Sequence, residues 1–288
     1  MADPDPRWKR LLKTVVPAPA RRRLRRWQAE LPTRLRDAPG DLLDSLPLPG
    51  RVPFPPARLR ARVGWTRSRR EYERAGGDAA RSVLDAFGAH GNSPGGRWLD
   101  FGCGSGRLAR HFLASPSRPR LVGADVDLEA LLWCARHLPG AFVGIPAHGT
   151  LPFRDAAFDV VVASSVFTHL DRGPARGWLA EIRRVLVPGG LLLASTHSER
   201  LAYLRPDLTA EDRRALEQEG FAFRKGSGPF NDACAFHTRE FLARDWGGFF
   251  DLAEHRPHGL AGFQDLTVWR RAEAGAIPRE SRSTASRS

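Results

Sequence analysis

The sequence predicts an α/β protein in which helices cover both faces of a mainly parallel sheet. From residue 97 to residue 197, short apolar runs alternate with segments whose apolar residues recur at helical spacing. A glycine-rich turn, DFGCGSG at residues 100–106, joins the first apolar run to the first of these helices. One such domain with extensions fits a chain of 288 residues.

The predicted elements follow one another in a regular order. Strands are expected at 97–101, 120–126, 141–145, 158–165 and 191–197, with helices at 106–113, 127–138 and 174–186. Two further strands, at 248–257 and 263–271, are expected to close the sheet as an antiparallel pair. The alternation stops at about 198–247, which we interpret as an insertion in the substrate region.

The N-terminal part has a different organisation. Leu24, Trp27, Leu31 and Leu35 predict an amphipathic helix over 21–36, the proline-rich segment 47–56 indicates a linker, and a second helix is expected at 71–87. We therefore expect a basic, partly flexible extension at 1–50, a cap or linker helix region at 51–92, the main domain at 93–271 and a disordered tail at 272–288.

The net charge of +13 is concentrated at one end of the chain. Residues 1–70 hold 18 of the 45 Lys and Arg residues but only six of the 32 Asp and Glu residues. The remainder of the chain is nearly neutral, with 27 basic and 26 acidic residues. A polyanion partner is therefore a hypothesis for the N-terminal quarter, although an arginine-rich composition alone accounts for the same excess.

Other compositional features exclude several protein classes. No apolar run approaches the ~18–20 residues that span a membrane, and the N-terminus is a poor secretory signal. The three cysteines, Cys103, Cys134 and Cys234, lack metal-ligand spacing and indicate reduced thiols in a cytoplasmic protein. We predict no bound metal.

The turn DFGCGSG carries the strongest functional signal. Glycines at 102, 104 and 106 permit backbone turns and close approach of a ligand at the carboxyl end of a strand. The spacing differs from the GxGxxG pattern of dinucleotide sites. Asp100 at the head of the turn would repel a phosphate, so the pattern favours a nucleotide-like ligand that carries positive charge.

Four segments in order resemble the class I S-adenosylmethionine-dependent methyltransferase family, in particular methyltransferase domain families 11 and 25. They are DFGCGSG, VGADVD at 122–127, LPFRDAAFDVVVASSVFTHL at 151–170 and RRVLVPGGLLL at 183–193. The resemblance implies a Rossmann-like fold with a seven-stranded, mainly parallel sheet and an antiparallel last strand. It implies S-adenosylmethionine as cofactor and S-adenosylhomocysteine as product.

The resemblance also implies a set of cofactor-binding residues. Asp100 suits the ammonium and sulfonium charges, Asp125 the ribose hydroxyls and Val126 the adenine; the full set is Asp100, Phe101, Gly102, Cys103, Gly104, Gly106, Asp125, Val126 and Ser164. One departure concerns residues 146–150, which read PAHGT where many relatives carry an acid for the adenine amino group. A backbone carbonyl or His148 is the alternative there.

The segment 51–77 and the signature SVFTHL at 165–170 resemble a bacterial subgroup of this family. In that subgroup the N-terminal extension is expected to cap the cofactor pocket. The subgroup often accompanies sugar or secondary-metabolite pathways, so the resemblance implies a small-molecule acceptor.

Candidate catalytic residues are histidines near the predicted strand ends. His169 follows the fourth strand and is our candidate general base, with local stabilisation of the loop as the alternative. Phe167, His197 and His237 are candidates for substrate binding. A structural role at the strand end for His197, and core filling for His237 beside Phe221, Phe223, Phe230 and Phe236, are the alternatives.

The sequence thus leaves several functions open. The leading hypothesis is methyl transfer to oxygen on a sugar or secondary metabolite, with nitrogen as another acceptor. The second is an RNA-modifying methyltransferase whose arginines at 21–26 contact phosphates. The third is a non-catalytic cofactor-binding module that acts on a partner or membrane through Trp27 and its basic helix. A dehydrogenase is the least favoured.

Overall fold

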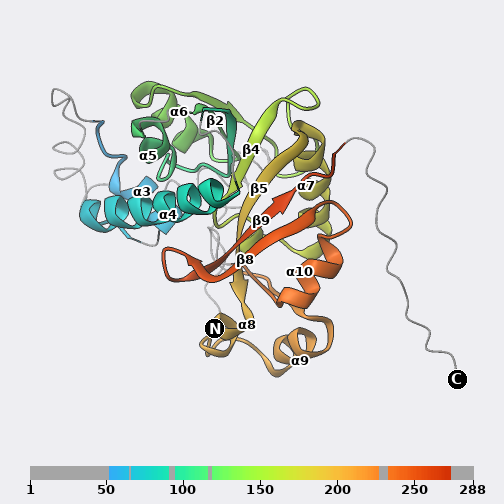
Figure 1. The fold of residues 1–288 in the computed structure, drawn as a ribbon. Coiled ribbons are helices and arrows are strands. Elements are labelled where there is room, and N and C mark those ends of the chain that lie inside the picture. Colours follow the sequence, from blue (N-terminus) through green and yellow to red (C-terminus); the bar gives the residue numbers. More distant parts are fainter. Residues whose placement is uncertain (1–51, 65, 91–94, 116–118, 227–232, 274–288) are drawn as a thin grey trace, which may run out of the picture.

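We describe the protein from a computed structural model, which describes residues 52–64, 66–90, 95–115, 119–226 and 233–273 (Figure 1). The expected helix at 21–36, Phe230 and the tail from residue 274 lie outside the described residues.

The centre of the fold is a sheet in the order β3-β2-β1-β4-β5, which β9 and β8 extend beyond β5. Strands β1 to β5 are parallel to one another, β9 is antiparallel to β5, and β8 is antiparallel to β9. The bounds are β1 Arg97–Phe101, β2 Arg120–Asp125, β3 Ala141–Gly144, β4 Phe158–Ala163, β5 Leu186–Ser198, β8 Asp251–Leu260 and β9 Gln264–Arg270. The predicted α/β class and the antiparallel last strand are confirmed, whereas the expected count of seven strands is wrong, because the described residues form a sheet of nine.

Two features of the strands differ from the prediction. Strand β5 begins at Leu186, because the VPGG segment continues the pairing with β4 through a register shift after Phe158. A short hairpin, β6 Phe221–Arg224 and β7 Cys234–His237, extends the sheet beyond the end of β5. There His197 and Ser198 pair in parallel with Phe236 and His237. Four-residue strands are too short to display a clear alternation in the sequence.

The helices surround the sheet (Figure 1). Their bounds are α3 Ala57–Gly64, α4 Arg69–Ala89, α5 Ala109–Ala114, α6 Leu128–His137, α7 Arg172–Val185, α8 Glu199–Tyr203, α9 Ala210–Glu219 and α10 Arg239–Asp245, with a 3₁₀ turn η1 at Phe167–His169. Helix α4 begins two residues before its predicted start because the Ser68 hydroxyl caps it, accepting the Glu71 N–H at 3.3 Å. Among the described residues, no helix is long and apolar enough to cross a membrane.

Both faces of the sheet are buried, as expected for parallel strands between helices. Alternate residues of β4 point to opposite sides: Val161 and Ala163 join a core with α7 and α10, whereas Val160 and Val162 join a core with α4, α5 and α6. The carboxyl edge of the parallel strands lies between these two cores. That edge is where the glycine-rich turn and the strand-end aspartates are found.

Candidate functional site

The glycine-rich turn leaves β1 in a conformation that requires glycine. Gly102, Gly104 and Gly106 all have positive φ angles, at 77°, 52° and 76°. The N–H groups of Gly102 and Cys103 both donate to the Ala124 carbonyl, at 2.7 and 3.2 Å, which ties the turn to the end of β2. A Cβ atom at Gly102 would lie 2.3 Å from Val166. A side chain at this position would therefore clash with the protein itself, so the turn requires glycine there.

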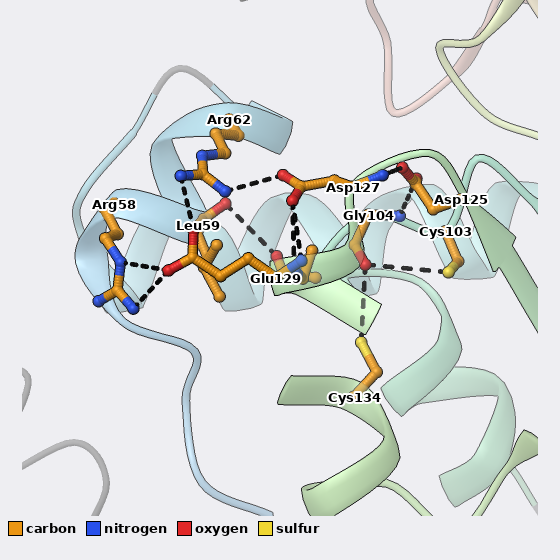
Figure 2. A network of polar contacts seen from close by, with 11 residues as sticks. Arg58, Leu59, Arg62, Cys103, Gly104, Asp125, Asp127, Glu129 and Cys134 are labelled. Atoms are coloured by element: carbon orange, nitrogen blue, oxygen red, sulfur yellow. Dashed lines mark hydrogen bonds and ion pairs between the residues drawn. The ribbon is translucent and has the colours of Figure 1, made fainter. Parts of the chain in front are cut away.

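Asp125 ends β2 and is fixed against this turn (Figure 2). Its Oδ2 accepts the Gly104 N–H at 2.6 Å and its Oδ1 accepts the Asp127 N–H at 2.8 Å. Each carboxylate oxygen has a further lone pair, so both can still accept a hydroxyl hydrogen. Burial raises the pKa of Asp125, which the two backbone hydrogen bonds oppose. The arrangement fits a vicinal diol such as a ribose.

Asp100 ends β1 in a less satisfied environment. Its side chain is buried, with 2% of the residue exposed, and its Oδ2 has no hydrogen-bond partner. Burial, followed by the negative charge of Asp125, raises the pKa of Asp100 to about 7. A buried carboxylate without a donor is costly and fits a site completed by a cationic ligand. The orphaned oxygen thus meets the requirement of an S-adenosylmethionine site.

Helix α3, which precedes the sheet in the sequence, lies against the glycine-rich turn (Figure 2). A Cβ atom at Gly104 would lie 2.3 Å from Val63 Cγ1, so the helix packs directly on the loop. Arg62 pairs with Asp127 at 2.8 Å and with Glu129 at 2.9 Å, and Arg58 pairs with Glu129 at 2.7 Å. These ion pairs hold α3 to the start of α6, the helix that follows Asp125.

The remaining predicted cofactor residues lie around the same edge. Val126 is 57% exposed, which leaves its side chain available to a planar ring. Ser164, just after β4, has a buried hydroxyl without a partner. The Phe101 ring packs in the core against Trp178, with centroids 5.1 Å apart, so its contribution to a ligand would come from its backbone. Cys103 contacts the loop itself, with its Sγ 3.8 Å from the Gly104 carbonyl.

His169 lies on η1, where the chain turns away from β4. Its Nδ1 lies 2.7 Å from the Ala233 carbonyl. Because a carbonyl only accepts, Nδ1 must carry the proton, and in the neutral ring Nε2 then holds the basic lone pair. This tautomer is the one that a general base at Nε2 requires.

The other acceptor-side candidates are more enclosed. His197 ends β5, and its Nε2 lies 3.3 Å from Gln264 Nε2; burial lowers the pKa of His197 to about 4. His237 is 3% exposed between Phe221 and Trp246, and burial lowers its pKa to about 3. Phe167 is fully buried against Trp246. The positions of His237 and Phe167 favour the packing role over direct contact with a substrate.

Two residues near the site were not predicted from the sequence. Gln264 bridges Ser165, whose hydroxyl donates to Gln264 Oε1 at 3.0 Å, and His197. Arg107 follows the glycine turn directly, and its Nε is buried without a partner. The motif offered one signal for Arg107, since it adjoins Gly106, but an arginine at the start of a helix is usually solvated.

Comparisons with known proteins bear on this edge of the sheet. Residues 99–194 match the family model described as methyltransferase domain. Phthiotriol/phenolphthiotriol dimycocerosates methyltransferase 1 of Mycobacterium ulcerans is 35% identical over 137 residues, covering 45% of this chain and 48% of that protein. Probable tRNA methyltransferase 9B of Bos taurus is 30% identical over 158 residues, covering 49% and 34%. The chain thus spans about half or less of the length of these relatives.

A solved structure shares the fold. It is the Burkholderia thailandensis 1,6-didemethyltoxoflavin-N1-methyltransferase with bound 1,6-didemethyltoxoflavin and S-adenosylhomocysteine, at a TM-score of 0.51 and 19% identity over 70% of this chain and 80% of that one. The matched residues 99–194 begin in β1 and end in β5, and they contain the glycine turn, Asp125 and His169. The part of the chain that matches the methyltransferase domain model is therefore the part that forms this edge of the sheet.

Proposed function

We propose that the protein transfers the methyl group of S-adenosylmethionine to a hydroxyl of a small molecule, a sugar or a secondary metabolite. The observation that carries this proposal is the pair of strand-end carboxylates at the glycine turn, of which Asp125 can accept two hydroxyls and Asp100 lacks any donor. Two similar proteins support a small-molecule acceptor: the phthiotriol/phenolphthiotriol dimycocerosates methyltransferase, and the methyltransferase whose structure holds 1,6-didemethyltoxoflavin.

In this proposal, different residues of the site bind different parts of the cofactor. Asp125 would bind the ribose, Val126 would contact the adenine, and Asp100 would face the positive charges. The cofactor supplies a methyl group that is already activated as a sulfonium. The protein's contribution is therefore mainly to hold the acceptor oxygen in line and to exclude water.

His169 supplies the base in this proposal. Its Nδ1–H bond to Ala233 orients the ring and leaves Nε2 to take the proton of the acceptor hydroxyl. His169→Asn should lower methyl transfer about 10²- to 10⁴-fold and leave affinity for S-adenosylhomocysteine unchanged. His137→Asn is the matched control, because His137 ends α6, at the opposite end of that helix from Asp125. Near-normal turnover of His169→Asn on the true acceptor would show that the base is elsewhere.

Calorimetric titration tests the cofactor independently of the acceptor. The full chain should bind S-adenosylhomocysteine and should not bind NADH. A panel of sugar and polyketide alcohols, followed by mass spectrometry for a gain of one methylene, then tests the acceptor class. Tight NADH binding without S-adenosylhomocysteine binding would contradict the proposal.

Residues 51–92 act in this proposal as a cap on the cofactor, as in the bacterial subgroup with the SVFTHL signature, and 93–271 as the catalytic domain. The packing of Val63 on Gly104 supports the capping role. A cytoplasmic location is part of the proposal, because Cys103, Cys134 and Cys234 form no disulfide, as is usual in reducing compartments.

A second candidate is methylation of RNA. A tRNA methyltransferase is among the relatives, and the first 70 residues hold most of the excess positive charge. The affinity for tRNA should then fall steeply with salt, and it should be lost when residues 1–51 are deleted. Absent or salt-insensitive binding would exclude this candidate.

A further inference from the structure

A chain of hydrogen-bonded side chains crosses the acceptor side of the site, from Ser165 through Gln264 to His197. Ser165 follows β4, Gln264 begins β9 and His197 lies near the end of β5. The Ser165 hydroxyl donates to Gln264 Oε1 at 3.0 Å, and Gln264 Nε2 lies 3.3 Å from His197 Nε2. Gln264 is buried, so these two contacts fix the orientation of its amide.

The direction of these hydrogen bonds determines where His197 carries its proton. The Gln264 oxygen accepts from Ser165, so the NH₂ group faces the imidazole and donates to Nε2. Nε2 must then be the unprotonated nitrogen. Burial, assisted by the nearby His169 and Arg205, lowers the pKa of His197 to about 4 and keeps the ring neutral at pH 7. The proton of the neutral ring therefore lies on Nδ1.

The Nδ1–H group of His197 is enclosed and has no hydrogen-bond partner within the described residues. The Ala235 carbonyl attracts the ring proton and so opposes the lowering of the pKa, but it is not placed to complete a hydrogen bond with Nδ1. An enclosed donor without an acceptor is destabilising, and native proteins rarely retain one. The contact from Gln264 thus maintains a donor for which the protein supplies no acceptor.

The other end of the chain is held in a strained backbone conformation. Ser165 has a φ of 58°, in the left-handed region that residues other than glycine rarely adopt. Its N–H donates to the Ser195 hydroxyl at 2.7 Å while its own hydroxyl donates to Gln264. Strain of this kind persists where the surrounding structure fixes it, and it is concentrated at ligand sites. Two hydrogen bonds from Ser165 therefore anchor the chain to β5 and β9.

An exposed aromatic ring lies beside the unpartnered donor. Phe263, in the turn between β8 and β9, is 58% exposed, and its ring centroid is 6.3 Å from that of His197. The buried Phe236 also contacts the imidazole, with centroids 5.5 Å apart. A donor beside an exposed apolar ring suits a planar ligand that has an apolar face and an oxygen atom.

We propose that His197 is a specificity-determining residue, which donates its Nδ1–H hydrogen to a carbonyl oxygen of the methyl acceptor while the acceptor's planar ring lies against Phe263. Gln264 is then a positioning residue, because it acts through the tautomer of His197. This inference rests on the proposed function and narrows its acceptor to a planar hydroxylated compound with a carbonyl group. A carbonyl oxygen only accepts, so it satisfies Nδ1–H without requiring a further polar group from the protein.

Nitrogen NMR of the full chain with labelled histidines tests the tautomer without any acceptor. At pH 7 His197 should have a protonated Nδ1 and an unprotonated Nε2, and its signals are identified as those lost in His197→Phe. Gln264→Glu replaces the donating amide by a carboxylate, which accepts, so Nε2 should gain a proton. Gln218→Glu, at an exposed position of α9, is the matched control and should leave these signals unchanged. An unprotonated Nδ1 in the wild type would overturn the proposal.

Pairs of small phenols test the carbonyl group. Each pair consists of the ortho, meta or para isomer of hydroxyacetophenone and the corresponding ethylphenol, which lacks the carbonyl oxygen. In NMR titrations with S-adenosylhomocysteine bound, the hydroxyacetophenone of at least one pair should bind about 3- to 10-fold more tightly, as one net hydrogen bond provides. His197→Phe keeps an aromatic ring but no donor. It should abolish this difference and leave the affinity for the ethylphenol within twofold.

Phe263→Ala should weaken both members of that pair to the same extent, since it removes the apolar contact and leaves the donor in place. Leu132→Ala is the matched control, because Leu132 on α6 is exposed to a similar degree. It should leave both affinities unchanged. Thermal unfolding of each variant checks the fold.

The outcomes distinguish this inference from the proposed function. Equal affinities within every pair, including no binding of either member, overturn the role of His197 while the wild type still binds S-adenosylhomocysteine. A difference that survives in His197→Phe has the same consequence. Failure of the wild type to bind S-adenosylhomocysteine overturns the proposed function, whichever tautomer His197 adopts.

Discussion

Burial leaves Asp100 with 2% of its surface exposed and its Oδ2 without a donor. The ionised carboxylate is therefore less stable in the folded protein than in the unfolded chain. Burial and the neighbouring Asp125 raise its pKa to about 7, against an ordinary value near 4. The residue that best fits cofactor binding is thus one that destabilises the protein without its ligand, as is common at functional sites.

Asp100→Asn should make the protein without ligand more stable at alkaline pH. A carboxyl whose folded pKa is raised favours folding below its unfolded pKa, and that contribution is lost as pH rises through about 7. The amide has no charge to lose. Urea unfolding should therefore show a gain of roughly 4 kcal/mol at pH 8 and roughly 2 kcal/mol at pH 5. The same gain at both pH values would contradict the raised pKa.

The affinity for S-adenosylhomocysteine should depend on pH through the same group. The ligand's ammonium requires an ionised Asp100, so the dissociation constant should fall as pH rises through about 7, by up to about tenfold per unit below the pKa. Calorimetry between pH 5.5 and pH 8 measures this dependence. In Asp100→Asn the affinity should be weaker and nearly independent of pH over that interval. A flat profile in the wild type would indicate that Asp100 does not face the ammonium.

For single residues, the sequence predicted which ones belong to the motif but not their burial or their hydrogen bonds. Asp100 and Asp125 were identified by their spacing from the glycines, whereas their different numbers of donors follow from how the turn folds back on β2. For His237 the sequence left two roles open, a substrate pocket and core filling. Its burial between Phe221 and Trp246 depends on long-range packing, which the sequence pattern does not display. Arg107 has no local pattern that distinguishes it from a solvated arginine.

Among the elements, α3 has the closest link to the proposed cofactor site. It is eight residues long, too short to be stable alone, and its ion pairs to Asp127 and Glu129 attach it to α6. Arg60 further fixes the segment by donating to the carbonyls of Pro55 and Arg67, at 2.7 and 2.8 Å. The position of α3 therefore depends on the same helix start that follows Asp125.

A double-mutant cycle tests whether α3 packs on the glycine turn. Gly104→Ala should cost about 2–4 kcal/mol in unfolding free energy, because it adds left-handed strain and a contact with Val63 Cγ1. In the Val63→Ala background that methyl group is gone, and the cost should fall to about 1 kcal/mol. Gly88→Ala, on α4 with open space around it, is the control and should be neutral or stabilising. Equal costs in both backgrounds would place α3 away from the turn.

The elements with long apolar periodicity were predicted well, and short ones were not. The strand at 97–101 and the helices on 127–138 and 174–186 agree with β1, α6 and α7 to within two residues. The β6–β7 hairpin was missed because each strand has four residues and its pairing with β5 is non-local. The sequence therefore defined the domain core but left the architecture of 198–247 open.

At the scale of the whole molecule, the site lies between two hydrophobic cores that the sheet separates. The core with α4 and α5 adjoins Arg107 and the glycine turn, and the core with α7 and α10 adjoins His169 and His237. The cofactor and acceptor sides of the site are thus attached to different cores. On the acceptor side, the inserted helix α10 packs in the same core as α7 and is also joined to it by ion pairs.

Asp245 makes the strongest polar contact of that kind. It ends α10 with 4% of its surface exposed, and it accepts from Arg172 at 2.8 Å and Arg176 at 2.9 Å, both on α7. Asp245→Ala should lower the unfolding free energy by about 2–3 kcal/mol, because both charge-assisted contacts are lost in a largely buried setting. Asp155→Ala is the control: its carboxylate pairs with Arg184 at 2.8 Å but is 79% exposed, so its loss should cost less than about 1 kcal/mol. Urea unfolding followed by tryptophan fluorescence measures both, and Trp246 beside Asp245 reports directly on α10. A loss for Asp245→Ala no larger than that for Asp155→Ala would show that apolar packing alone holds the acceptor side in place.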